Sequence, residues 1–146
     1  GLSWLTILRK RPAFRAAFAG FAPESVAAFD ESDILRLLGD VGIVRHRRKI
    51  EAAVTNARAT VRLLEREGVG GLDTLVWSHA PPDPGSPPVR MADLPAHTPE
   101  SRALAQALKA EGFVFVGPTT AYATMQACGV VNDHLVGCAY RDRDEQ

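Results

Sequence analysis

Apolar residues recur every three or four positions along most of the chain, which is the spacing of one face of an α-helix. The longest stretch of this kind covers residues 45–68. Its apolar face is expected to comprise Ile50, Val54, Ala57, Val61 and Leu64. Shorter stretches predict helices over residues 2–11, 12–21, 23–29, 30–40, 72–79, 98–112, 119–129 and 132–140. These elements together predict an all-α protein.

Helix boundaries carry their own signals. Asp30, with an acid three residues later, is a good N-cap for the helix at 30–40, and Thr98 followed by Pro99 opens the helix at 98–112. Asn132 or Asp133 is expected to cap the last helix. Five prolines between residues 80 and 90 predict a surface loop, which we place at 80–97. Residues 113–117 are expected to be extended chain, because a lone strand has no partner.

Length and charge restrict the class of protein only weakly. A chain of 146 residues suits one domain, which we assign to 1–146. The 17 basic and 17 acidic residues cancel, but basic residues dominate 1–20 and 41–66, and acidic residues dominate 21–40. Such asymmetry indicates a charged surface, although solvated helix faces explain it equally well. The sequence has no apolar run typical of a membrane span and no signal peptide.

Residues 37–50 (LLGDVGIVRHRRKI) carry the strongest candidate for a binding site. A helix ends, a turn containing Gly42 follows, and a basic helix begins. Helix N-termini present free amides and partial positive charge, so the turn is suited to hold a phosphate without reading sequence. A plain corner between two helices with an exposed basic turn is an equally good interpretation.

The remaining candidates are single residues or pairs. His134 and Cys138 are four apart, so on a helix both would face one metal ion, whereas Cys128 fits an apolar core. Trp4 and Tyr122 suit either a ligand pocket or a buried helix face, and the apolar neighbours of Trp77 favour the core. No nucleophile triad and no nucleotide-binding glycine loop is present.

Several segments, in order, resemble one family. They are GLSWLTILRKR, GIVRHRRKIEAAVTNAR, LVWSHAP and GFVFVGPTTAYATMQACGVVNDHLVGC, which span most of residues 1–138. The chain resembles DNA-3-methyladenine glycosylase I, the constitutive bacterial type. The resemblance implies a helix-hairpin-helix DNA glycosylase fold with a structural zinc that joins the two termini. His134 and Cys138 match two of its four ligands, and the other two are expected upstream of Gly1.

The resemblance also implies roles for individual residues. Trp4 matches the tryptophan that stacks on the damaged base, and Tyr122 is the second base-binding candidate. The residues expected to contact DNA are Leu2, Ser3, Gly42, Ile43, Val44, Arg45, His46 and Lys49. No catalytic residue is assigned, because the family's acidic base-recognition residue is expected upstream of Gly1.

The expected function is base-excision repair in the bacterial cytoplasm. A monomer would bind double-stranded alkylated DNA, flip out 3-methyladenine and hydrolyse its N-glycosidic bond, without cutting the strand. The chain is expected to lack the N-terminal helices of such an enzyme. Two alternatives follow, namely a non-enzymatic helix-hairpin-helix module that binds DNA and an inactive fragment.

Overall fold

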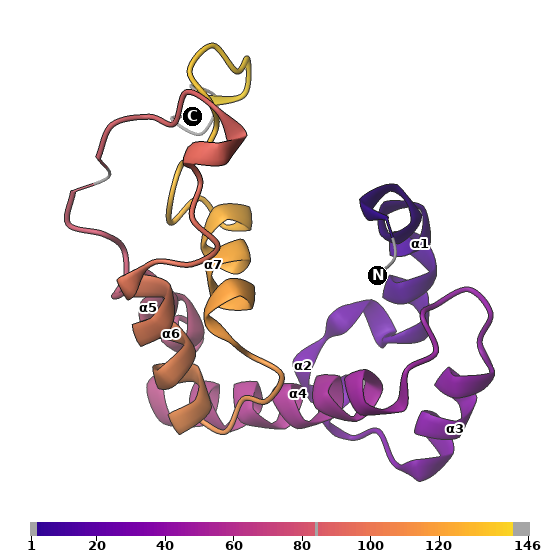
Figure 1. The fold of residues 1–146 in the computed structure, drawn as a ribbon. Helices are drawn as coiled ribbons and strands as arrows, with labels where there is room; N and C mark the ends of the chain where they lie inside the picture. Colours follow the sequence, from indigo (N-terminus) through magenta and orange to yellow (C-terminus); the bar gives the residue numbers. More distant parts are fainter. Residues whose placement is uncertain (1–2, 84, 142–146) are drawn as a thin grey trace. The chain divides into compact units, whose positions relative to one another are not determined.

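The structure, a computed structural model, describes residues 3–83 and 85–141, and these residues form helices and loops without a strand (Figure 1). The α-helices are α1 (Trp4–Ala17), α2 (Pro23–Ala27), α3 (Glu31–Gly39), α4 (Arg47–Glu67), α5 (Gly71–Trp77), α6 (Pro99–Ala110) and α7 (Pro118–Ala127). Two short 3-10 helices are η1 (Ala19–Phe21) and η2 (Met91–Asp93). The chain divides into two compact units, residues 1–68 with 112–115 and residues 69–111 with 116–146.

The first unit has a core built on α4. Both α2 and α3 pack against this helix. The buried cluster consists of Ala17, Phe18, Val26, Phe29, Leu37, Ile43, Ile50 and Val54. Arg58 of α4 closes the end of α2, because its guanidinium donates to the carbonyls of Ala27 at 2.9 Å and Phe29 at 3.0 Å.

The predicted apolar face of α4 is only part of what the helix buries. Ile50 and Val54 are buried as expected, but Ala52, Ala59 and Leu63 are buried as well. The last three lie on a second stripe of a helix that has 3.6 residues per turn. More than one face of α4 is therefore covered.

The helices predicted at 2–11 and 12–21 are one helix. The helix continues after Pro12 as expected, but α1 runs from Trp4 to Ala17 without a break, so Pro12 lies inside the helix and not in a first helical turn. A proline within a helix removes one hydrogen bond and crowds the carbonyl four residues earlier. Phe14 of α1 and Phe18, the C-cap of α1, follow Pro12 and stack with ring centroids 6.3 Å apart, and this packing favours helical backbone after the proline.

The second unit packs α6 against α7. Leu104, Leu108, Tyr122 and Met125 are buried in it. Two assignments to the core are wrong here, because Trp77 keeps 46% of its surface exposed and Cys128 is exposed. Trp77 is the last residue of α5, and Cys128 is the C-cap of α7, so both lie where a helix ends.

Capping signals were reliable guides to the helix starts. Asp30 accepts from the amides of Ser32 and Asp33 at the start of α3, in a capping box. The side-chain hydrogen bond from Ser32 and the two amides lower the pKa of Asp30. Thr98 caps α6 in the same manner, through Ser101.

The last predicted helix, at 132–140, does not form. This segment consists of turns, with Gly137 at φ 81, a left-handed conformation that ends helices. The amide of Val136 donates to the carbonyl of Pro88, and the Asn132 side chain donates to the carbonyl of Arg141. These non-helical hydrogen bonds replace those of a helix. Asp133 therefore has no helix to cap.

The two predicted irregular segments have no strand. Residues 80–83 and 85–97 form loops, the second of which contains η2, and 113–117 are extended or turning chain. No helix within the described ranges is long and apolar enough to cross a membrane.

Candidate nucleic-acid interface

The turn between α3 and α4 is held by hydrogen bonds that use its own backbone. Asp40 accepts from the amide of Gly42 at 2.7 Å, and the ammonium of Lys10 donates to the carbonyls of Val41 and Gly42, both at 3.0 Å. The amide of Gly42 is thus already bound to a carboxylate. The close approach that Gly42 allows is made by residues of the protein, Asp40 and Ala13. A Cβ at residue 42 would lie 2.9 Å from Asp40 Oδ1 and 3.1 Å from Ala13 Cβ.

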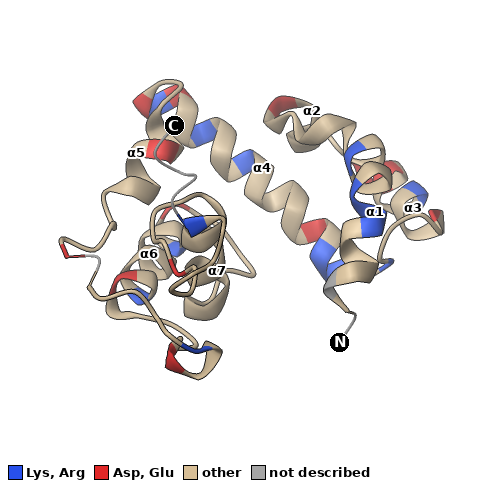
Figure 2. Ribbon diagram, turned by 90° about the horizontal axis from the view of Figure 1, so that it is seen from above, with Lys and Arg blue, Asp and Glu red and all other residues tan. Residues whose placement is uncertain are grey.

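Basic residues are concentrated at the N-terminus of α4, where Figure 2 marks them in blue on the ribbon. Arg45, His46, Arg47 and Arg48 are exposed and line one cleft of about 450 Å³, together with Phe115. The first amides of a helix have no partner within it, and they carry partial positive charge. The cleft can therefore attract and bind an anion such as a phosphate group.

The four basic residues are not equivalent. Arg47 binds Glu31 at 3.0 Å and Glu51 at 3.2 Å, and these hydrogen bonds, first to Glu31 and then to Glu51, raise the pKa of Arg47. Within the described part of the chain, Arg45 and Arg48 have no ion-pair partner. They are the arginines available to an external anion.

His46 combines a structural role with a possible contact. Its Nδ1 accepts from the amide of Lys49 at 3.3 Å and so caps α4. Because Nδ1 is the acceptor, the proton of the neutral ring is on Nε2. Nε2 has no hydrogen-bond partner among the described residues, and His46 lines the cleft.

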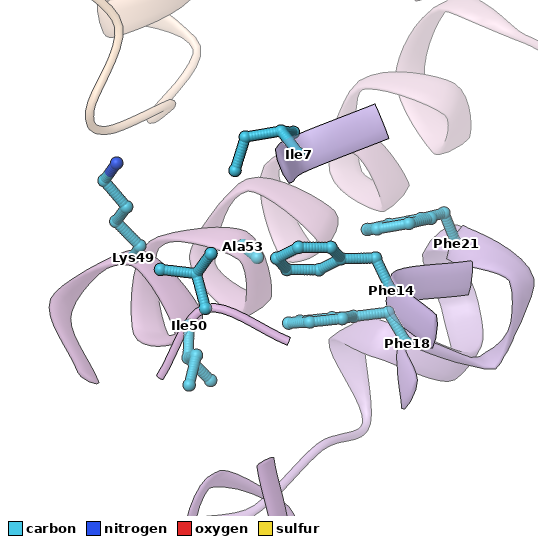
Figure 3. A pocket seen from close by; sticks show the side chains of 8 residues that line it. Ile7, Phe14, Phe18, Phe21, Lys49, Ile50 and Ala53 are labelled. Carbon is cyan, nitrogen blue, oxygen red and sulfur yellow. The ribbon is translucent and has the colours of Figure 1, made fainter. Parts of the chain in front are cut away.

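Three residues that were expected to contact DNA have other surroundings. Ile43 is 3% exposed and belongs to the core of the first unit. Val44 and Lys49 line a separate apolar pocket (Figure 3). Of the residues expected at the turn, Arg45 and His46 are those that the structure brings to the cleft.

The apolar pocket, of about 480 Å³, is a feature that the sequence did not indicate. Its other lining residues are Ile7, Phe14, Phe18, Phe21, Ile50 and Ala53. Figure 3 shows the three phenyl rings side by side, with the Lys49 nitrogen pointing away from them. None of the described residues that line the pocket carries a carboxylate, so these side chains offer no anionic acceptor for the exocyclic amine of a base.

The N-terminal candidates are described only in part. Leu2 and the side chain of Trp4 lie outside the described residues, although the backbone of Trp4 begins α1. Ser3 is the N-cap of α1, and its hydroxyl accepts from the amide of Thr6 at 3.2 Å. Ser3 is exposed, so this role is compatible with contact to a ligand.

Tyr122 is a buried residue of the second unit rather than part of a described pocket. It is 5% exposed, and its hydroxyl donates to Asp133 Oδ2 at 2.5 Å, as does the Gln126 amide at 2.7 Å. Burial, followed by the bond to Asp133, raises the pKa of Tyr122 well above 10.0. Since its hydroxyl is already bound, Tyr122 has a structural role in this arrangement.

His134 and Cys138 lie together even though no helix connects them. His134 Nδ1 and Cys138 Sγ are 3.5 Å apart. Two such ligands on one tetrahedral zinc would be about 3.6 Å apart, from the usual Zn–N and Zn–S lengths. The separation is that of a hydrogen bond between the thiol and the imidazole, and it would also suit two ligands of one metal ion. Among the described residues, no group of three or more His, Cys, Asp and Glu side chains is arranged to hold a metal ion.

The described residues thus form helices and loops, with a cleft lined by basic residues at the start of α4. The family described as methyladenine glycosylase matches residues 1–142. The DNA-3-methyladenine glycosylase 1 of Escherichia coli K12 is 48% identical over 139 residues, which cover 94% of this chain and 73% of that protein. The chain therefore belongs to the methyladenine glycosylase family.

Solved structures agree with this assignment. A crystal structure of 3-methyladenine DNA glycosylase I has a TM-score of 0.88 and 46% identity, and the match covers 95% of this chain and 76% of that one. A structure of the Staphylococcus aureus enzyme, solved to explain 3-methyladenine recognition, has a TM-score of 0.87 and 34% identity. That match covers 97% of this chain and 74% of the other. The helical fold is thus that of these glycosylases.

Proposed function

We propose that this chain acts on alkylated DNA as a DNA-3-methyladenine glycosylase in base-excision repair. The observation that carries the proposal is the 48% identity over 139 residues to an enzyme of that name. The exposed cleft at the start of α4, with Arg45 and Arg48 unpaired among the described residues, adds physical support. The reaction is hydrolysis of the N-glycosidic bond of a flipped 3-methyladenine, without strand cleavage. We place the reaction in the bacterial cytoplasm and the protein on double-stranded DNA as a monomer.

The proposed division of labour follows the charges. Arg45 and Arg48 hold the phosphates of the DNA backbone at the α3–α4 turn, which acts as the hairpin of a helix-hairpin-helix element. Trp4, whose backbone begins α1, is assigned to the flipped base because it matches the tryptophan that stacks on the base in the family. 3-Methyladenine is cationic in DNA, and a cation over an indole gains roughly 0.5–2 kcal/mol. Because the alkylated base is already a good leaving group, water can complete the hydrolysis without a strong catalytic base.

A zinc ion held by His134 and Cys138 forms part of the proposal. Their 3.5 Å separation suits a tetrahedral metal, and two further ligands would come from outside this pair. A closed site with four protein ligands stabilises the fold and supplies no open position for chemistry. Titration with Co²⁺ tests this: a thiolate charge-transfer band should appear with the chain and disappear in Cys138→Ser.

The decisive test is release of free 3-methyladenine from methylated duplex DNA by this chain, with the E. coli relative as positive control. We expect release, and we expect Arg48→Gln to reduce it at limiting protein, where DNA binding determines the rate. Lys109→Gln, which removes one exposed charge from α6, is the matched control and should have no effect.

The outcome also decides between this function and the alternative of a DNA-binding module. Salt-sensitive binding of DNA without base release would refute the enzyme and favour the module. Absence of both would refute DNA recognition by this chain.

A further inference from the structure

Phe115 is an exposed aromatic residue beside the basic turn. Its side chain is 57% exposed, and it lines the cleft with Arg45, His46, Arg47 and Arg48. Its backbone has φ 58, the left-handed region that a bulky residue rarely adopts. Exposure of a phenyl ring and an unfavourable backbone conformation both count against a role in packing. A residue kept in such a conformation is a candidate for function.

The neighbouring residues hold Phe115 in this position. Phe113 is 9% exposed and belongs to the first unit. Asn56 of α4 then takes both polar groups of Val114: its Nδ2 donates to the Val114 carbonyl at 3.1 Å, and its Oδ1 accepts from the Val114 amide at 2.8 Å. With one residue buried and the next fixed by two hydrogen bonds to α4, the chain has little freedom at Phe115. The backbone therefore holds Phe115 at the cleft that the arginines line.

We propose that Phe115 is a DNA-contacting residue whose ring packs on a sugar or base of the strand held by Arg45 and Arg48. A nucleic-acid strand alternates anionic phosphates with flat, weakly polar groups, and proteins bind such strands by pairing basic and aromatic side chains. The cleft offers both within a few residues. The inference rests on the proposed function, because it requires that this face binds DNA.

The charged and the aromatic contact respond differently to salt. Each phosphate contact changes the slope of log K against log salt by about 0.9, because a bound cation is released. An aromatic contact releases no ion. Loss of Phe115 should therefore weaken binding equally at every salt concentration, whereas loss of the arginines should flatten the slope.

The experiment measures binding of the 146-residue chain to a fluorescent duplex by anisotropy at several salt concentrations. Phe115→Gly removes the ring but suits a positive φ, so the backbone conformation is retained. We expect binding about five-fold weaker or more, with an unchanged slope. Phe21→Gly is the matched control, because Phe21 is also an exposed phenylalanine with positive φ (62) but lines the apolar pocket instead. It should bind as the unmodified chain does.

Two further variants keep the inference separable from folding. Phe115→Trp retains an aromatic face and should bind within about two-fold of the original, whereas Phe115→Leu retains only bulk and should bind as weakly as Phe115→Gly. If Phe115→Gly loses helical circular dichroism, the comparison of Trp with Leu decides the question. Equal binding by these two variants would overturn the inference.

The double variant Arg45→Gln/Arg48→Gln separates this inference from the proposed function. If it flattens the salt slope while Phe115→Gly binds normally, the role of Phe115 is refuted and DNA binding at the turn stands. If neither change affects binding, or if the unmodified chain binds no DNA, the role of Phe115 and DNA binding at the α3–α4 turn are both refuted.

Discussion

Replacing Gly42 by alanine tests whether the α3–α4 turn depends on the close approach seen in the structure. The added methyl group would lie 2.9 Å from Asp40 Oδ1 and 3.1 Å from Ala13 Cβ, both closer than van der Waals contact allows. Asp40 would have to release the amide of residue 42, a bond of 2.7 Å. Overpacking typically costs about 1–3 kcal/mol, and a lost hydrogen bond about 0.5–1.5 kcal/mol. We expect a loss of about 2–4 kcal/mol in the free energy of unfolding.

The chain offers a matched control three residues earlier. Gly39 also lacks a positive φ, and a Cβ there meets nothing within 4 Å. Because alanine is the better helix former, Gly39→Ala at the end of α3 should be neutral or stabilising by up to about 1 kcal/mol. Urea unfolding followed by circular dichroism measures both variants. If Gly42→Ala is no less stable than Gly39→Ala, the turn is not packed as described and the argument fails.

Three further predictions concern other parts of the molecule. Since burial raises the pKa of Tyr122, the contribution of this residue to stability is complete below pH 10.0 and is lost as pH rises above that value. The free energy of unfolding, measured from pH 9 upward, should therefore fall more steeply for the unmodified chain than for Tyr122→Phe. Tyr140→Phe, which changes an exposed tyrosine, should fall as steeply as the unmodified chain. Asn56→Ala removes two hydrogen bonds to Val114 and should lower the free energy of unfolding by about 1–3 kcal/mol, measured by thermal or urea unfolding. A loss below about 0.5 kcal/mol would mean that these two hydrogen bonds do not hold Val114 in place. His46→Ala should cost about 0.5–2 kcal/mol because the N-cap of α4 is lost, whereas His46→Asn, which can still cap, should recover most of it; equal losses would rule out capping by this side chain.

Features that depend on neighbouring residues could be predicted from the sequence. The starts of α3 and α6 follow from Asp30 and Thr98, because a cap acts through amides two or three positions away. The loop at 80–97 follows from its prolines in the same way. The continuity of α1 through Pro12 could not be predicted locally, since it depends on what Phe14 and Phe18 pack against.

The candidate site shows the same division. The basic character of the turn was evident from the sequence, but the division between Arg47, which is paired, and Arg45 and Arg48 depends on Glu31, which lies 16 residues before Arg47. The contribution of Phe115 to the cleft depends on Asn56, which lies 58 residues before Val114 in the chain. Contacts at such separations leave no periodic signal in one sequence. The proximity of His134 and Cys138 was predicted for the wrong reason, because turns rather than a helix bring them together.

Lys10 of α1 links this helix to the α3–α4 turn. Its ammonium binds the carbonyls of Val41 and Gly42, so α1 and the α3–α4 turn are joined by two charge-assisted hydrogen bonds as well as by the contact of Ala13 at Gly42. In the proposed function, Trp4 at the start of α1 meets the flipped base, and the turn meets the phosphates. A flipped base stays covalently attached to the backbone that the turn holds, so the two contacts must keep a fixed separation. A rigid link between the helix and the turn meets that requirement, and for this reason we regard Lys10 as part of the binding architecture although it faces the protein.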